Sequence, residues 1–192
     1  MRHARVQRTT AETNVGVDVE LDGSGQASIE TGIPFFDHLL GGLARHSGFD
    51  LTVRAVGDLH VDAHHTVEDT GIVLGQALRQ ALGDGEGIAR FASIHLPMDD
   101  ALVLVALDIS GRPYVNCDLT FPTGQVGTFP TDLVEEMLRA FAMNAAVTLH
   151  VGQVRGDNSH HIAEAVFKGL GVTLGRATRI VGRGVPSTKG VL

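Results

Sequence analysis

Two short segments of the chain each carry adjacent histidines followed, three residues later, by a glutamate. They are His64-His65-Thr66-Val67-Glu68 and His160-His161-Ile162-Ala163-Glu164, and they start 96 residues apart in a chain of 192. Imidazole nitrogen and carboxylate oxygen both bind divalent metal ions, and a lone histidine pair on a protein surface would not need a repeated glutamate. The residues that follow also correspond, Leu74, Gly75 and Leu78 matching Leu170, Gly171 and Leu174. The pattern indicates an internal duplication that carries two copies of a metal-binding helix.

Adjacent side chains on a helix diverge by about 100°, so two neighbouring histidines cannot easily bind one ion together. They can bind one ion each, and we therefore predict two metal centres that draw ligands from both copies. His38 lies 26 residues before His64, and Glu136 holds the matching place in the second half when the apolar residues are aligned. The predicted ligands are His38, His64, His65, Glu68, Glu136, His160, His161 and Glu164. Nitrogen and oxygen donors without thiolate suit Mn²⁺, Fe²⁺ or Zn²⁺, and the number of ligands favours six-coordinate Mn²⁺.

Composition excludes several classes of function. A formal net charge of −7 argues against nucleic acid as a partner, because phosphate neutralisation needs a basic surface. The single cysteine, Cys117, rules out an intrachain disulfide and a cysteine-based zinc site. The longest apolar run, residues 101–107, is too short to cross a bilayer, and no signal segment opens the sequence. We therefore expect a cytoplasmic protein, or an organellar one after removal of a leader, with no membrane partner.

The order of expected elements is the same in both halves. In the first half we expect strands at 5–21, 26–30 and 51–56, with helices at 34–47 and 64–82. In the second half we expect strands at 90–96, 101–109, 115–121 and 148–154, with helices beginning near Thr131 and Asn158. The predicted class is α+β, with halves 1–87 and 88–192 in one compact unit and helices packed between two sheets.

Several longer motifs resemble the imidazoleglycerol-phosphate dehydratase family of histidine biosynthesis. The resemblance covers essentially the whole chain and rests on segments 8–13, 36–38, 62–69, 110–114, 158–165 and 186–190. It implies two ribosomal-S5-domain-2-like ββαβα halves, two Mn²⁺ per active site, and a hollow homo-oligomer of 24 subunits with octahedral symmetry and metal sites between subunits. Glu136 departs from some family members, which carry a metal-binding histidine there; a carboxylate can still bind Mn²⁺.

The resemblance also implies a reaction, the loss of water from imidazoleglycerol phosphate to give imidazole acetol phosphate. Our hypothesis is that the metal ions stabilise the deprotonated imidazole of the substrate, which then expels hydroxide from the neighbouring carbon. Glu164 is the first candidate for the base that removes the carbon proton and Glu12 the second, while His46 assists proton transfer to the departing hydroxyl. Two simpler interpretations stay open: Glu164 as a metal ligand only, and Glu12 as a surface charge.

The phosphate group of such a substrate needs fixed cations and hydroxyl donors. By resemblance these are Arg90, Arg112, Lys168, Ser187 and Lys189, with Thr188 in the same loop. Residues 186–190 are expected to form a mobile loop that orders over the substrate. Two alternatives use the same ligands, a dimetal hydrolase of a phosphorylated small molecule and a non-catalytic metal-storage shell. Arg112 and the Ser187-to-Lys189 segment argue against storage, which needs no phosphate site.

Overall fold

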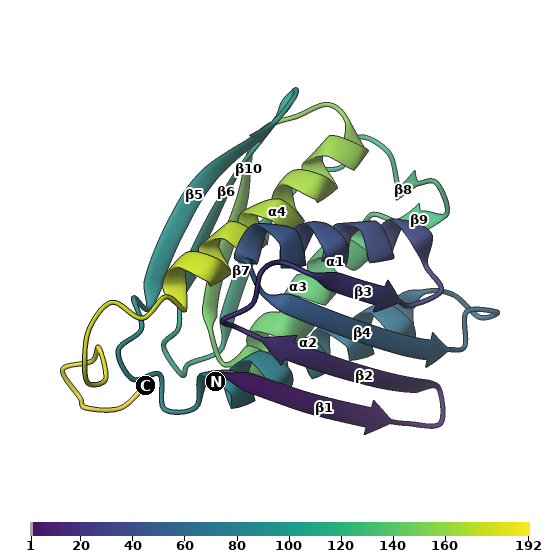
Figure 1. Ribbon diagram of the computed structural model, residues 1–192. Helices are drawn as coiled ribbons and strands as arrows, with labels where there is room; N and C mark the ends of the chain where they lie inside the picture. Colours follow the sequence, from purple (N-terminus) through teal and green to yellow (C-terminus); the bar gives the residue numbers. More distant parts are fainter. Residues whose placement is uncertain (1) are drawn as a thin grey trace.

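Four helices lie between two four-stranded sheets in the computed structural model, which describes residues 2–192 (Figure 1). The elements of the first half are β1 (His3–Thr9), β2 (Thr13–Glu20), β3 (Ala27–Glu30), α1 (Pro34–Ser47), β4 (Asp50–Gly57) and α2 (His64–Leu82). Those of the second half are β5 (Phe91–Met98), β6 (Ala101–Asp108), β7 (Tyr114–Asp118), β8 (Gln125–Val126), β9 (Phe129–Pro130), α3 (Asp132–Ala145), β10 (Thr148–Arg155) and α4 (Ser159–Ala177).

The two large sheets have the same topology, which agrees with a duplicated unit. The strand orders are β1-β2-β4-β3 and β5-β6-β10-β7. In each sheet the last pair is parallel and the other pairs are antiparallel. The predicted α+β class with helices between two sheets is confirmed. A small hairpin, β8 with β9, is the addition that distinguishes the second half.

The first half contains one strand more than the predicted ββαβα order. The segment expected as one strand over 5–21 is a hairpin, because the chain turns between Thr10 and Thr13. The Thr10 N–H donates to the Thr13 carbonyl oxygen at 2.9 Å, and the Thr13 N–H donates to the Thr10 hydroxyl at 2.9 Å. Threonine side chains support such turns without the glycine or proline that usually marks them in a sequence. Each half is therefore βββαβα.

Local signals explain where the helices begin and end. Pro34 stands in the first turn of α1, and Gly48 ends it with φ of 80°, a left-handed conformation that favours glycine. The Asn158 side chain caps α4 by accepting from the N–H groups of His160 and His161. Thr131 holds the predicted position before α3, but its hydroxyl donates to the Thr123 carbonyl oxygen at 3.1 Å and does not cap the helix.

The helices pair across the two halves: α1 packs against α4, and α2 packs against α3. Two equivalent glycines allow these close crossings. A Cβ atom at Gly171 would lie 2.5 Å from the Leu43 carbonyl oxygen, and one at Gly75 would lie 2.5 Å from the Phe141 carbonyl oxygen. The buried apolar residues of both halves form one cluster. The two halves thus share one core. This core fixes the start of α4 in the α1–α4 pair and the start of α2 in the α2–α3 pair.

The replacement Gly171→Ala is expected to lower the free energy of unfolding by about 1–3 kcal/mol, because the added methyl group overlaps the α1 backbone. Gly41→Ala is the matched control, since its Cβ would meet no heavy atom within 4 Å. That variant should be neutral or more stable by about 0.5–1 kcal/mol, the usual preference of a helix for alanine. Urea unfolding measures both, and equal stabilities would contradict the close crossing.

Within residues 2–192, none of the helices has the length and apolar character that crossing a membrane requires.

Candidate metal centre

Three predicted ligands meet where α1 packs against α4. His38 Nε2 lies 3.1 Å from Glu164 Oε1, and His160 Nε2 lies 2.7 Å from the same oxygen. One ligand atom from each residue falls within 4.8 Å of the others. His160 and Glu164 share a face because they stand one helical turn apart, and His38 reaches them from the other half of the chain. Two imidazoles and one carboxylate form a donor set that fits a divalent ion such as Mn²⁺.

Glu164 is buried, yet it is held in its ionised form. Burial raises its pKa, but hydrogen bonds from Lys168, His38 and His160 more than offset this and lower the pKa to about 2. The Lys168 ammonium group contacts Oε2, the carboxylate oxygen that the histidines leave free. A carboxylate with so low a pKa is a weak proton acceptor but a ready metal ligand. The two imidazoles that converge on Oε1 favour the ligand role of Glu164 over its predicted role as the base.

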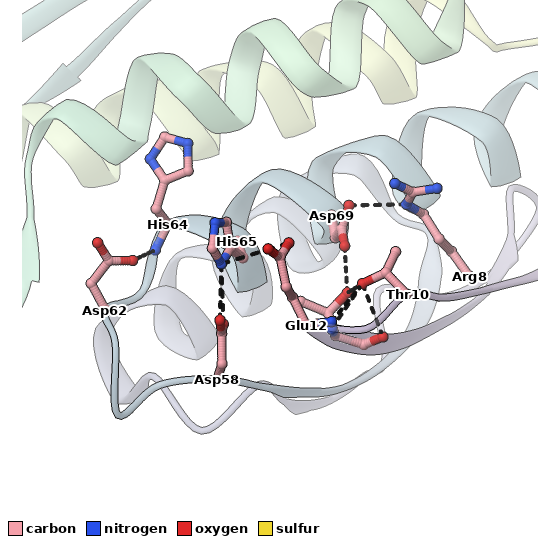
Figure 2. A network of polar contacts seen from close by, with 9 residues as sticks. Arg8, Thr10, Glu12, Asp58, Asp62, His64, His65 and Asp69 are labelled. Atoms are coloured by element: carbon pink, nitrogen blue, oxygen red, sulfur yellow. Dashed lines mark hydrogen bonds and ion pairs between the residues drawn. The ribbon is translucent and has the colours of Figure 1, made fainter.

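The remaining predicted ligands lie outside this cluster. Glu68 and Glu136 are half-buried on α2 and α3, the second helix pair, and His64 is exposed at the start of α2. In the described part of the chain, only His38, His160 and Glu164 bring three such ligand atoms together. The helix geometry gives the reason, because neighbouring histidines point in different directions and the two helix pairs are separate. Figure 2 shows the His64 ring turned away from the group around His65.

The second histidine of each pair contacts a carboxylate that the sequence did not indicate. His65 Nδ1 lies 3.0 Å from Asp58 Oδ2, with Glu12 Oε2 further away at 3.8 Å (Figure 2). His161 Nδ1 lies 2.5 Å from Asp100 Oδ1. Hydrogen bonds to these aspartates raise the pKa of both histidines. Asp58 stands seven residues before His65 in a loop, but Asp100 is 61 residues before His161, so no local spacing could have revealed it.

The predicted phosphate-binding cations occupy three different environments. Lys168 lies on α4 beside the cluster, where its ammonium group also approaches the Met98 sulfur at 3.3 Å. Arg112 follows β6, and its guanidinium donates through Nη1 to the Ser110 carbonyl oxygen at 3.5 Å. Arg90 is engaged: its guanidinium binds Asp108 through Nε at 2.7 Å and Nη2 at 3.2 Å, and its Nη1 donates to the Pro186 carbonyl oxygen at 2.8 Å. Arg90 thus holds the start of the C-terminal loop in this structure.

The predicted loop residues form a short turn at the end of the chain. The Ser187 N–H donates to the Val185 carbonyl oxygen at 2.8 Å, and the Gly190 N–H donates to the Ser187 carbonyl oxygen at 3.0 Å. Thr188 and Lys189 are exposed. Beyond them Leu192 lies against Gly85 and Gly111, where an added Cβ would meet it. The loop is therefore attached at both of its ends, through Arg90 and through Leu192.

His46 lies at the far end of the α1–α4 contact from His38. Burial lowers its pKa, as do the charges of Lys168 and Arg45. His38 and His46 are two turns apart on α1, as His160 and Lys168 are on α4. The other predicted base, Glu12, stands in the β1–β2 turn with a half-exposed side chain.

Asp69, beside the first repeated motif, is a structural residue. It is buried and accepts hydrogen bonds from Arg8 Nε at 2.9 Å (Figure 2) and from the Thr13 hydroxyl. These contacts attach α2 to the hairpin that carries Glu12. The position of Glu12 relative to His65 is consequently supported by a charge pair in which Asp69 is buried and Arg8 half-exposed.

Comparison with known proteins decides the family. The family model described as imidazoleglycerol-phosphate dehydratase matches residues 31–174, which is most of the chain. The chain belongs to this family. It is a family of hydro-lyases, and the match confirms the resemblance carried by the histidine motifs.

Members of the imidazoleglycerol-phosphate dehydratase family match along the full length. A relative of that name from Azorhizobium caulinodans is 58% identical, with 100% of this chain and 99% of the relative covered. Another from Desulforudis audaxviator is 58% identical, with 100% and 98% covered. Among solved structures, the dehydratase from Pyrococcus furiosus matches with a TM-score of 0.86 and 41% identity over 97% of this chain and 100% of that one. The dehydratase from Staphylococcus aureus gives 0.84 and 38% over 94% and 99%.

Proposed function

We propose that the chain dehydrates imidazoleglycerol phosphate to imidazole acetol phosphate in histidine biosynthesis, in the cytoplasm, with two Mn²⁺ per active site. The observation that carries the proposal is the convergence of His38, His160 and Glu164 beside Lys168. This arrangement places side chains that can bind a divalent metal ion next to a lysine that can bind phosphate. Relatives named for this reaction match the chain from end to end.

The metal ligands would come from both helix pairs. His38, His160 and Glu164 would hold one ion, and the residues at the start of α2 together with Glu136 and His161 would complete the set. Bound Mn²⁺ would lower the pKa of the imidazole ring that it coordinates and so stabilise its deprotonated form.

The protein's own groups bind, orient and move protons. Lys168, Arg112, Ser187 and Lys189 supply the positive charges and donors that a phosphate group requires. Glu12 is the better candidate for the group that accepts the carbon proton, because its carboxylate is half-exposed and makes no hydrogen bond to His65. Glu164, surrounded by three donors, remains a ligand. His46, whose pKa is lowered by burial and by the Lys168 charge, is kept as the candidate that passes a proton to the departing hydroxyl, although it stands two turns from His38 on α1.

Homo-oligomer formation, with 24 subunits and metal sites between them, is part of the proposal. A six-coordinate ion needs more ligands than the three that His38, His160 and Glu164 provide. The other predicted ligands lie elsewhere on the same chain, which supports a site completed by a second copy. A neighbouring copy can supply them if its second helix pair lies against the first pair of this chain.

An assay with imidazoleglycerol phosphate and Mn²⁺ tests the proposal. We expect a ketone product, whereas a dimetal hydrolase would release free phosphate and a storage shell would give neither. Sedimentation of the same sample should show a large particle that dissociates when a chelator removes the metal, since metal ligands shared between subunits also join them. Release of phosphate without ketone would refute the dehydratase assignment.

A further inference from the structure

We infer that Asp58 and Asp100 are positioning residues, which hold the rings of His65 and His161 so that each ring presents Nε2 to a metal ion. The inference rests on the proposed function, because it takes both histidines as metal ligands. It adds two carboxylates to the site that neither the repeated motif nor its spacing indicates.

Both contacts involve the same ring nitrogen. Asp58 approaches His65 Nδ1 with both oxygens, at 3.0 and 3.3 Å, and Asp100 Oδ1 approaches His161 Nδ1 at 2.5 Å. A ring that donates its Nδ1–H to a carboxylate keeps its free lone pair on Nε2. Carboxylates that fix a metal-binding histidine in this way set its orientation and increase its basicity.

The two aspartates do not correspond in the duplicated sequence. Asp58 lies in the loop between β4 and α2, seven residues before His65, and the residue seven before His161 is the exposed Val154. Asp100 instead comes from the turn between β5 and β6. The same contact is therefore made in each half by a residue from a different place. If the contact were only inherited from the duplicated ancestor, the aspartate would stand at the same position in both halves. Because it comes from two different positions, we infer that the aspartate–histidine contact itself has a role.

Each carboxylate is held in place by its surroundings. The second oxygen of Asp100 accepts from the N–H groups of Asp157 and Asn158, at 2.7 and 3.0 Å, just before α4 begins. The side chain of Asp58 is only 17% exposed. A ligand is positioned well only when the group that orients it is itself fixed, and both aspartates meet that condition.

Glu12 and Asp100 occupy equivalent turns, between the first two strands of their halves. Asp100 bonds its histidine, whereas Glu12 stays 3.8 Å from His65 Nδ1 because Asp58 holds that ring. The first half therefore has one carboxylate to orient the histidine and a second left free to accept a proton. The turn of the second half also carries two carboxylates: Asp100 orients the histidine, and the exposed Asp99 lies with Oδ2 3.6 Å from His161 Nε2, on the side of the ring that faces the proposed ion.

The test challenges the Mn²⁺-loaded protein with increasing chelator and measures the concentration that removes half of the metal. Asp58→Ala is expected to weaken Mn²⁺ binding about 10–100-fold, the usual cost of losing such an orienting group. Asp58→Asn should lose less, since an amide oxygen still accepts the Nδ1–H. Asp100→Asn should also weaken binding, while its amide oxygen can keep the contacts with the loop before α4.

Two controls remove the same charge nearby. Asp62→Asn keeps an oxygen for the His64 N–H, and Asp157 has an exposed side chain without a polar contact to another described residue. Asp62→Asn and Asp157→Asn should bind Mn²⁺ within about threefold of the unchanged protein. Co²⁺-loaded samples supply a second measurement, because the visible spectrum of the ion should shift in the Asp58 and Asp100 variants but not in the controls.

The possible results separate the inference from the proposed function. Asp58 and Asp100 variants that behave like their controls would overturn the inference while leaving a Mn²⁺-dependent enzyme in place. A lower thermal midpoint with unchanged Mn²⁺ affinity and Co²⁺ spectrum would also overturn it, since the role would then be structural. A protein that never retains Mn²⁺ would instead refute the proposed metal dependence, and the inference with it.

Discussion

Glu164→Gln is expected to lower kcat/KM by about a thousand-fold or more, and to release Mn²⁺ at chelator concentrations that the unchanged protein tolerates. Loss of an orienting group outside the ligand set already costs about 10–100-fold, and a ligand should cost more. Glu164 is also the carboxylate that His38, His160 and Lys168 share, so glutamine would leave their donors without a negative partner. Turnover and metal content are measured on the same samples.

Glu135→Gln is the matched control, because that carboxylate is half-exposed on α3 and its one ion pair in the described residues is with Arg139 in the next turn. It should leave both measurements unchanged. Loss of turnover with Mn²⁺ fully retained would assign Glu164 as the base and contradict the ligand role. Unchanged turnover would remove Glu164 from the site altogether.

Removal of residues 186–192 is expected to raise KM about 100-fold or more while Mn²⁺ content stays the same. Hydrogen bonds from charged groups contribute about 1.5–3 kcal/mol each, and the deletion removes both Ser187 and Lys189 from the phosphate. Each such loss corresponds to about 10–100-fold in affinity. The metal cluster should be unaffected, since His38 and Glu164 belong to α1 and α4. Steady-state kinetics and metal analysis of the truncated enzyme check both parts.

Val191→Ala serves as the control for the deletion, because the Val191 side chain is exposed and carries no group that could bind phosphate. It should keep the original KM. A truncated enzyme with unchanged kinetics would show that the C-terminal loop does not bind substrate.

The three residues that meet at α1 and α4 were among the eight ligands predicted from the sequence, because their signals are local or repeated, but their grouping into one cluster was not predicted. His160 and Glu164 share a helical face by spacing, and Phe36, Leu39, Leu40 and Leu43 show which face of α1 is buried. The class of fold followed from the same patterns. The hairpin at Thr10 was missed because its turn uses threonine hydroxyls, which carry little turn signal in a single sequence.

Contacts between distant segments were not predictable in the same way. Asp100 reaches His161 only because β5 and β6 bring their turn to the start of α4. Arg90 was expected to face phosphate, but its contacts with Asp108 and Pro186 depend on the folded position of the chain end. The residue types of Asp100 and Arg90 indicate what each group can bind, but the residues that they contact are known only from the tertiary structure.

The exchange of helices between the halves has a consequence for the origin of the chain. Since α1 packs on α4 and α2 on α3, a polypeptide of half this length would leave uncovered the helix faces that meet the other half, although α2 would still pack on β1 and β2. Two such copies would have to associate before either had a complete interior. Fusion at the segment between Leu82 and Phe91 keeps the second copy near the first at all times, at an effective concentration of about millimolar. In the fused chain, the contact between His38 and His160 therefore forms at any protein concentration, whereas two separate halves would first have to associate.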